Sequence, residues 1–376
     1  MNNGRHIHKA AAKALTALSM IAVLSGLFSV AGCSTVDYTG SELTPTDTFV
    51  RYRMDWAGQT EVPSEMTVVM SRILNTIHFS CLMDSLGTMT AAMQDSTMTP
   101  CDTLTGLTMP NGEYYILAFN VHPETNILQG YSSFITDKSA SMRDIYISAH
   151  RHSKEEIAEL TGESTDFNPT QGYIKQLKPV WLDVQKVNIH PDIDTMVTVT
   201  PVPLTQNVTF RIGIETEAGV EIEEVRADIS GVPETVQLMT GHISDTLTHR
   251  VPFDMKPSEM RNAAQMYEGS VCVAGIFPSP DATYITGAGI LQISVKAKAG
   301  GHERTFRAGI NLKQVLTDAR LVEKVSETER LYRIGVSEAI IDADAKLKIE
   351  QDQIILDGDG QGVGVWVDKD ELEFEI

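Results

Sequence analysis

The chain has few aromatic residues, few cysteines and fewer basic than acidic side chains. Phe, Trp and Tyr make up 6% of its 376 residues and there are 4 cysteines, which excludes a small scaffold held together by disulfides. Lys and Arg total 30 against 50 Asp and Glu, for a net charge of −20, and the basic residues form no cluster. Such a surface repels a phosphate backbone, so we expect no nucleic-acid partner.

Local motifs of common catalytic sites are also missing from the sequence. It contains no glycine-rich phosphate loop, nucleophile elbow, paired-cysteine zinc motif or His-Glu-x-x-His sequence. A hydrolase that uses two separated carboxylates needs no local motif, so that class stays open as a third hypothesis. We predict a non-enzymatic protein with no cofactor and no metal.

The N-terminus has the pattern of a lipoprotein signal peptide. Three basic residues precede an uncharged apolar run over residues 14–31. Residues 29–34, Ser-Val-Ala-Gly-Cys-Ser, resemble the bacterial lipobox, in which the cysteine is lipidated before cleavage. We predict a signal peptide over 1–32 and lipidation of Cys33. An uncleaved transmembrane helix is the alternative, but no positively charged stop-transfer cluster follows the run.

Residues 33–47 are polar and contain no basic side chain, so we predict a tether between the lipid and the first folded domain.

Three cysteines follow the predicted tether. In an oxidising compartment a disulfide between Cys81 and Cys101 would close a loop of about 20 residues and contribute about 3 kcal/mol. Cys272 lies in an apolar run and is predicted to be a buried small side chain. A catalytic role is the alternative, which burial disfavours because it raises the pKa of a thiol.

Alternation of apolar and polar residues is the recurring pattern of the rest of the chain. In residues 208–214 every second residue is apolar, as a strand with one buried face requires. Four further segments alternate in the same way: 197–199, 225–229, 291–297 and 372–376. Short spacing between Gly, Pro and Asn residues favours a mostly-β fold of antiparallel sandwiches.

Helix signals are few. A capping-box pattern at Ser153 predicts a short helix ending near Gly162, and apolar spacing predicts a helix within 311–325. Residues 255–266 form a weaker candidate.

Proline marks the expected domain boundary. The segment 200–204 reads Thr-Pro-Val-Pro-Leu and lies between two strand patterns. Because proline cannot donate to a central ladder, the chain is expected to leave one sheet here and begin another. We predict an N-terminal sandwich over 48–200 and a C-terminal sandwich over 205–376.

Five further segments follow the lipobox in a fixed order. They are expected to be a first strand with an Asp-Trp pair, a turn into a strand ending in Asn, a strand with a Ser-Gly turn, and two closing strands: 49–56, 107–120, 225–238, 362–368 and 372–376. In this order the sequence resembles the Bacteroidetes fimbrillin-like anchor and minor fimbrial lipoproteins over almost the whole mature chain.

This resemblance implies two tandem transthyretin-like β-sandwich domains without an active site. It also implies lipid attachment to the outer membrane at the cell surface, and binding to other fimbrial subunits by strand exchange. An open sandwich edge is a template for a donated strand, which agrees with this expectation. Residues 311–350 match no family strand, so which strand is donated or received stays open.

Two metal hypotheses and one glycan hypothesis remain. His150 and His152 could form a minimal metal pair, but surface histidines before a capped helix are the favoured explanation because no third ligand accompanies them. Three tryptophans could form a sugar platform on a surface glycan-binding lipoprotein, or belong to the core: Trp56, Trp181 and Trp366. A calcium loop has oxygen donors at matching positions, Asp357, Asp359, Gln361 and Asp368, but a Gly-Asp hairpin is favoured because its flanks are strand-like.

Overall fold

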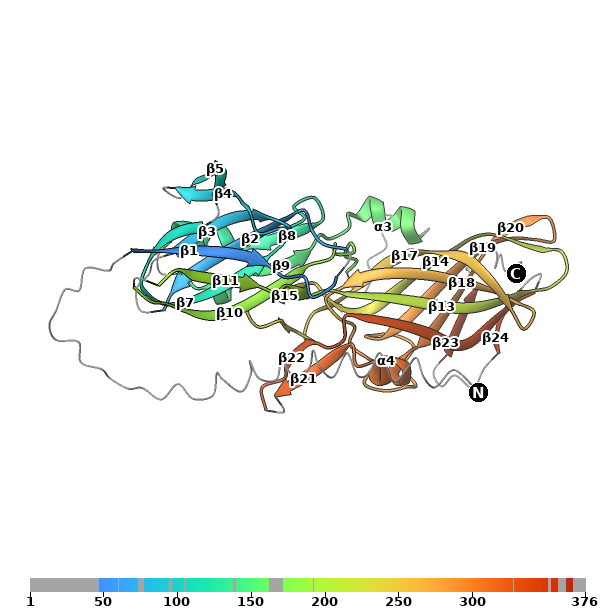
Figure 1. The fold of residues 1–376 in the computed structure, drawn as a ribbon. Coiled ribbons are helices and arrows are strands. Elements are labelled where there is room, and N and C mark those ends of the chain that lie inside the picture. Colours follow the sequence, from blue (N-terminus) through green and yellow to red (C-terminus); the bar gives the residue numbers. More distant parts are fainter. Residues whose placement is uncertain are drawn as a thin grey trace, which may run out of the picture. The chain divides into compact units, whose positions relative to one another are not determined.

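The computed structural model describes residues 47–367, apart from 60, 74–77, 95–96, 105, 138–139, 162–171, 192, 327, 351–352 and 358–362. These residues form a mostly-β structure in which all strand pairs except β1–β11 and β13–β23 are antiparallel. The predicted fold class is therefore confirmed (Figure 1). No helix in the described part of the chain has the length and apolar character needed to cross a bilayer.

The N-terminal sandwich packs a three-stranded sheet, β11-β1-β6, on a seven-stranded sheet, β12-β10-β7-β2-β3-β4-β5. Its strands are β1 (Asp47–Met54), β2 (Glu65–Arg72), β3 (His78–Asp84), β4 (Met89–Gln94), β5 (Thr97–Leu104), β6 (Gly106–Pro110), β7 (Gly112–Phe119), β10 (Trp181–Ile189), β11 (Thr195–Val199) and β12 (Val202–Pro203). Methionine fills much of the core between them, and the hydroxyl of buried Tyr52 lies 2.7 Å from the sulfur of Met70 and 3.1 Å from that of Met109.

The C-terminal sandwich is one nine-stranded sheet, β24-β23-β13-β18-β17-β14-β19-β20-β25, folded into two layers. Its strands are β13 (Gln206–Thr216), β14 (Val220–Pro233), β17 (Thr248–Arg261), β18 (Ala264–Val273), β19 (Ile290–Ala299), β20 (His302–Asn311), β23 (Glu338–Ile349), β24 (Ile354–Asp357) and β25 (Val363–Val367). Strand β17 forms the corner because its first part pairs with β14 and its second part with β18. The alternating residues of β13 and β19 face the core between the layers, as the sequence predicts.

A third sheet draws strands from both sides of residues 200–204. Its order is β21-β22-β16-β15-β9-β8, with β8 (Asn126–Gln129), β9 (Tyr146–Ala149), β15 (Thr235–Gln237), β16 (His242–Ile243), β21 (Val322–Ser326) and β22 (Leu331–Ile334).

Where β9 meets β15, Arg151 donates two hydrogen bonds to the carboxylate of Glu234, at 3.0 and 2.7 Å. The buried ring of His249 lies 3.1 Å from the same carboxylate. We call these three residues the joint cluster. The predicted domain limits stay a prediction.

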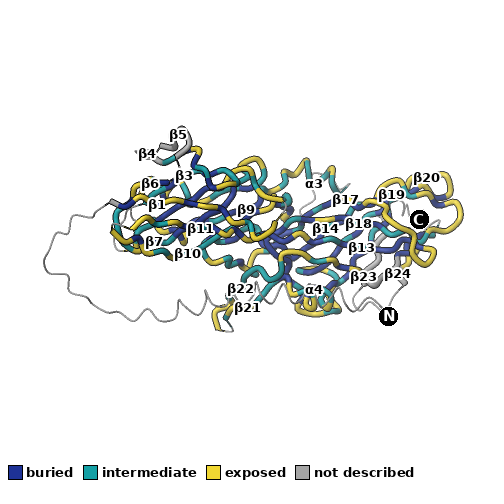
Figure 2. Tube along the Cα trace, viewed as in Figure 1, coloured by how far each residue is buried: buried dark blue, intermediate teal, exposed yellow. Residues whose placement is uncertain are grey.

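Helices are short: α2 (Tyr131–Thr136), the 3-10 helix η1 (Met142–Asp144), α3 (Lys154–Thr161) and α4 (Lys313–Ala319). The predicted capping box is confirmed, since the Ser153 hydroxyl accepts from the Glu156 N–H at 3.2 Å and the Glu156 carboxylate accepts from the Ser153 N–H at 2.8 Å. Figure 2 shows that buried residues lie along the strands, whereas α4 and the hairpin ends are largely exposed.

The helix predicted within 311–325 is present as α4, and it ends at Ala319 because the carbonyls of Arg320 and Leu321 accept hydrogen bonds from Val336 and Gly335 and the chain continues as β21. Two other local predictions are wrong. Residues 255–266 form the β17–β18 hairpin, which turns at Asn262 and Ala263 with φ of 52° and 70°.

The Ser-Gly turn expected within 225–238 is a β-bulge inside β14, where the register against β17 shifts between Ser230 and Val232. Gly231 has a φ of 89°, and a Cβ there would lie 2.5 Å from the carbonyl oxygen of Phe277. Both the backbone conformation and the close approach require glycine.

Candidate functional site

The last strand of the described chain lies at one edge of the nine-stranded sheet. β25 pairs antiparallel with β20, with Val363 opposite Ile310 and Val367 opposite Phe306. On β20 the apolar side chains of Phe306, Ala308 and Ile310 are buried. We call β25 together with Phe306–Ile310 the closing edge. Without β25, the main-chain groups of β20 would form an open edge directly beside a buried apolar row.

β25 pairs with one part of β20. β20 pairs with β19 along its whole length, from His302 opposite Ala299 to Asn311 opposite Ile290. Within the described residues, β25 pairs only with residues 306–310. Residues 358–362, which precede β25, include three glycines. The closing edge therefore contains a short strand that follows a glycine-rich segment.

The two cysteines of the predicted disulfide lie on strands that are not neighbours. Cys81 is on β3, opposite Ala92 of β4, and Ala92 is opposite Thr99 of β5, the strand that carries Cys101. Strands are spaced about 4.8 Å apart, so residues separated by one strand lie about 10 Å apart, whereas a disulfide spans at most about 7 Å between Cα atoms. The disulfide stays a prediction, and it would require this edge of the sheet to rearrange.

Most other predicted site residues lie outside the described part of the chain. These are Cys33, the lipidation site, and the calcium-loop candidates Asp359, Gln361 and Asp368. Asp357, the first residue of that loop, is the last residue of β24. His152 lies at the base of α3, 3.4 Å from the carboxylate of Glu156, and burial is the main cause that lowers its pKa. Across the described residues, no three His, Cys, Asp or Glu side chains converge on a metal position.

Two of the three tryptophans belong to the core of the N-terminal sandwich. Trp56 and Trp181 pack edge to face, with ring centroids 5.8 Å apart. Trp181 is 9% exposed, and the indole N–H of Trp56 donates to the carbonyl of Ser85 at 2.7 Å. These rings do not form an exposed sugar platform. Trp366 is the Cα partner of Arg307 in the closing edge.

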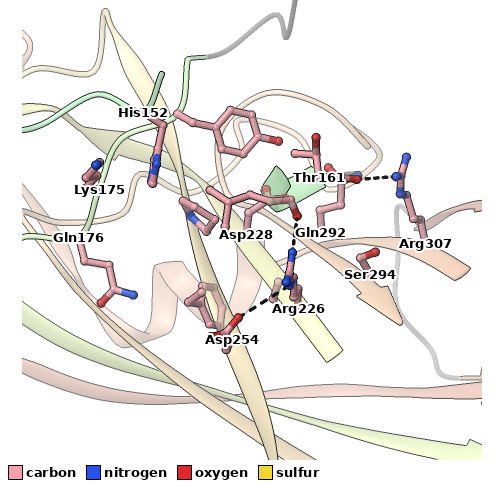
Figure 3. A pocket seen from close by; sticks show the side chains of 15 residues that line it. His152, Thr161, Lys175, Gln176, Arg226, Asp228, Asp254, Gln292, Ser294 and Arg307 are labelled. Atoms are coloured by element: carbon pink, nitrogen blue, oxygen red, sulfur yellow. Dashed lines mark hydrogen bonds and ion pairs between the residues drawn. The ribbon is translucent and has the colours of Figure 1, made fainter. Parts of the chain in front are cut away.

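A polar hollow of about 360 Å³ lies between α3 and the outer face of the C-terminal sandwich (Figure 3). Arg226 of β14 donates to the Glu159 carbonyl at 3.0 Å, and Arg307 of β20 donates to the Thr161 carbonyl at 2.7 Å. Both guanidinium groups thereby satisfy carbonyls at the C-terminal end of α3, where a positive charge is favourable. We call this space the polar hollow.

A buried ion pair forms part of the floor of the polar hollow. Asp228 of β14 pairs with Arg250 of β17, and both side chains are almost completely shielded from solvent. Burial raises the pKa of Asp228, against the opposing attraction of Arg250 and Arg307. At the rim, the Lys175 ammonium lies 2.6 Å from Glu156 and is the main cause that lowers the pKa of this carboxylate to about 2.

Sequence reasoning missed the polar hollow altogether. Its floor residues come from four strands that are distant in the sequence, and each is an ordinary polar residue on the outer face of its strand. The only local signal was the strict alternation of segments such as 291–297, which marks Gln292 and Ser294 as facing away from the core.

No protein-family model matches the chain, and no curated protein is similar to it. Its structure is similar to solved structures from Bacteroidetes. A candidate adhesin from Bacteroides ovatus is 11% identical, with a TM-score of 0.46, covering 83% of this chain and 97% of the other. The fimbrial anchor protein Mfa2 from Porphyromonas gingivalis is 12% identical, with a TM-score of 0.39, covering 86% and 98%.

A third similar structure, described as a candidate polysaccharide-binding protein from Bacteroides thetaiotaomicron, is 14% identical, with a TM-score of 0.40, covering 87% of this chain and 99% of the other.

Proposed function

We propose that this protein is a lipid-anchored subunit of a cell-surface fimbria, an anchor or accessory subunit that binds another subunit by β-strand addition at the closing edge. Attachment would be through Cys33 to the outer membrane, with 33–47 as the tether. The observation that carries the proposal is the pairing of the five-residue strand β25 with residues 306–310 of β20, over buried Phe306 and Ile310.

Strand addition at this edge has a physical basis. An extended segment can pair with the main chain of 306–310 as β25 leaves, because the main-chain hydrogen bonds lost to one strand are replaced by those of the other. β25 thus occupies the position that a partner's strand would take.

Peptide complementation tests this proposal. A chain that ends at Gly362 lacks β25 and should bind a synthetic peptide with the sequence of residues 363–376, whereas the full-length chain should bind it much more weakly. The matched control is the same peptide with Val365→Pro, which lacks one main-chain donor in the middle of the strand and should not bind. Equal binding of both peptides, or no binding by the shortened chain, would refute strand addition at this edge.

Anchoring is tested separately. Cys33→Ala should release the protein from the membrane fraction, because the thiol is the predicted attachment point for the acyl chains. The matched control is Cys272→Ala, which leaves the lipobox intact and should stay with the membrane. If the Cys33 variant remains in the membrane after a high-salt wash, the lipoprotein assignment is wrong.

A further inference from the structure

The floor of the polar hollow is built from aligned rows across four strands. In the first row Arg226 of β14 lies opposite Asp254 of β17 and Ser294 of β19, and Ser294 lies opposite Arg307 of β20. In the next row on the same face, Asp228 lies opposite Gln292. Opposite residues share one face of a sheet, so these side chains form a continuous polar floor.

Most charged groups of the hollow already have partners within the chain. Asp228 pairs with Arg250, and the Arg226 guanidinium lies 2.8 Å from the Glu224 carboxylate. Lys175 pairs with Glu156 at the rim. These contacts fix the walls and largely balance the charges, so the hollow is shaped before any ligand arrives.

Two polar side chains at the centre of the hollow differ from these charged groups, because they have no partner among the described residues. Gln292 and Ser294 lie between Arg226 and Arg307 (Figure 3), and neither side chain has a hydrogen-bond partner among the described residues. Both residues are half-buried. An amide and a hydroxyl that lie side by side in a hollow, with no partner among the described residues, can donate to and accept from the polar groups of a ligand.

The chemistry of the hollow favours a neutral, hydroxylated ligand. An amide and a hydroxyl each offer a donor and an acceptor, which matches ligand hydroxyls that do the same. Most charged groups of the hollow are paired within the chain, so few of them are available to bind a charged ligand. Tyr173 and Pro252 add apolar wall against which the CH face of a sugar ring can pack. The volume of about 360 Å³ lies within the range of small-molecule sites, about 300–1,000 Å³.

We infer that the polar hollow binds one neutral sugar unit of a glycan, with Gln292 and Ser294 as the central hydrogen-bonding residues. This site adjoins the closing edge, because Arg307 belongs to both, and the sugar is recognised by groups on β14, β19 and β20 rather than by the tryptophans. The protein would then bind a glycan and a protein partner at neighbouring positions.

Saturation-transfer NMR on the full mature chain tests the inference. The probes are glucose, galactose, mannose and N-acetylglucosamine, with glucuronate as the acidic comparator. We expect at least one neutral sugar to bind, and Gln292→Leu combined with Ser294→Ala to weaken binding at least about tenfold. The thermal unfolding midpoint should stay unchanged, because neither side chain has a hydrogen-bond partner in the part of the chain that the structure describes. Lys298→Ala, on β19 outside the hollow, is the matched control and should bind as the unmodified chain does.

Three results would overturn the inference: no neutral sugar binds, only glucuronate binds, or the double variant binds as tightly as the unmodified chain. If the double variant fails to fold, Ser294→Ala alone provides the same comparison with a smaller change. Peptide complementation at the closing edge should be unaffected by these variants, so failure of the sugar site and failure of the subunit proposal are distinguishable.

Discussion

Replacing Glu234 with alanine should weaken the connection between β9 and β15. The Glu234 carboxylate is 20% exposed and accepts both hydrogen bonds of Arg151, whose side chain is 60% exposed. Solvent screens a pair of this kind, so we assign it about 1 kcal/mol despite its bidentate geometry. The His249 side chain is 4% exposed, and losing its contact with Glu234 leaves it without that partner at a further cost of about 1 kcal/mol.

These contributions predict an order for the variants. Glu234→Ala should lower the free energy of unfolding by about 2 kcal/mol and Arg151→Ala by about 1 kcal/mol. The double variant should cost no more than Glu234→Ala alone, which corresponds to a coupling of about 1 kcal/mol. Urea unfolding followed by circular dichroism at pH 7 measures all three values.

An exposed ion pair next to β22 provides a control variant. Arg330 pairs with Asp245 and its side chain is 69% exposed, so Arg330→Ala should lower the free energy of unfolding less than Arg151→Ala does. If Glu234→Ala costs no more than Arg151→Ala, the buried histidine contributes nothing through Glu234. If the two single effects simply add, the joint cluster does not act as a unit, and the reasoning is refuted.

Three other perturbations have outcomes that follow from the structure. Burial is the main cause that lowers the pKa of His152, His242 and His249 from 6.5, so the folded protein binds fewer protons than the unfolded chain as the pH falls below this value. The thermal unfolding midpoint should therefore drop between about pH 7 and pH 5, and a constant midpoint would contradict this. Gly130→Ala should cost more than about 2 kcal/mol in urea unfolding, because φ is 76° and the new Cβ would lie 1.8 Å from the Asp144 carbonyl, whereas Gly300→Ala, with φ of 59° and open space around it, should cost less. Asn120→Ala should cost about 2 kcal/mol, since its buried side chain accepts from the Trp181 N–H at 2.6 Å; an unchanged urea midpoint would argue against this role.

Local patterns in the sequence determined the elements whose signals are themselves local. Alternation over 208–214 and 291–297 places these segments as strands with one buried face, and the structure has both as long strands of the C-terminal sandwich. The Ser153 capping box likewise begins α3. In each case the side chains and main-chain groups that decide the conformation lie within a few residues of each other.

Partners from distant parts of the chain decided the rest. The helix after Asn311 stops at Ala319 because Gly335 and Val336 pair with the carbonyls that follow it. The sheet that joins β9 to β15 and the rows of the polar hollow depend on register between strands far apart in sequence. A period of two shows which face of a strand is buried but carries no information about its neighbour, so Gln292 and Arg226 meet only in the folded chain.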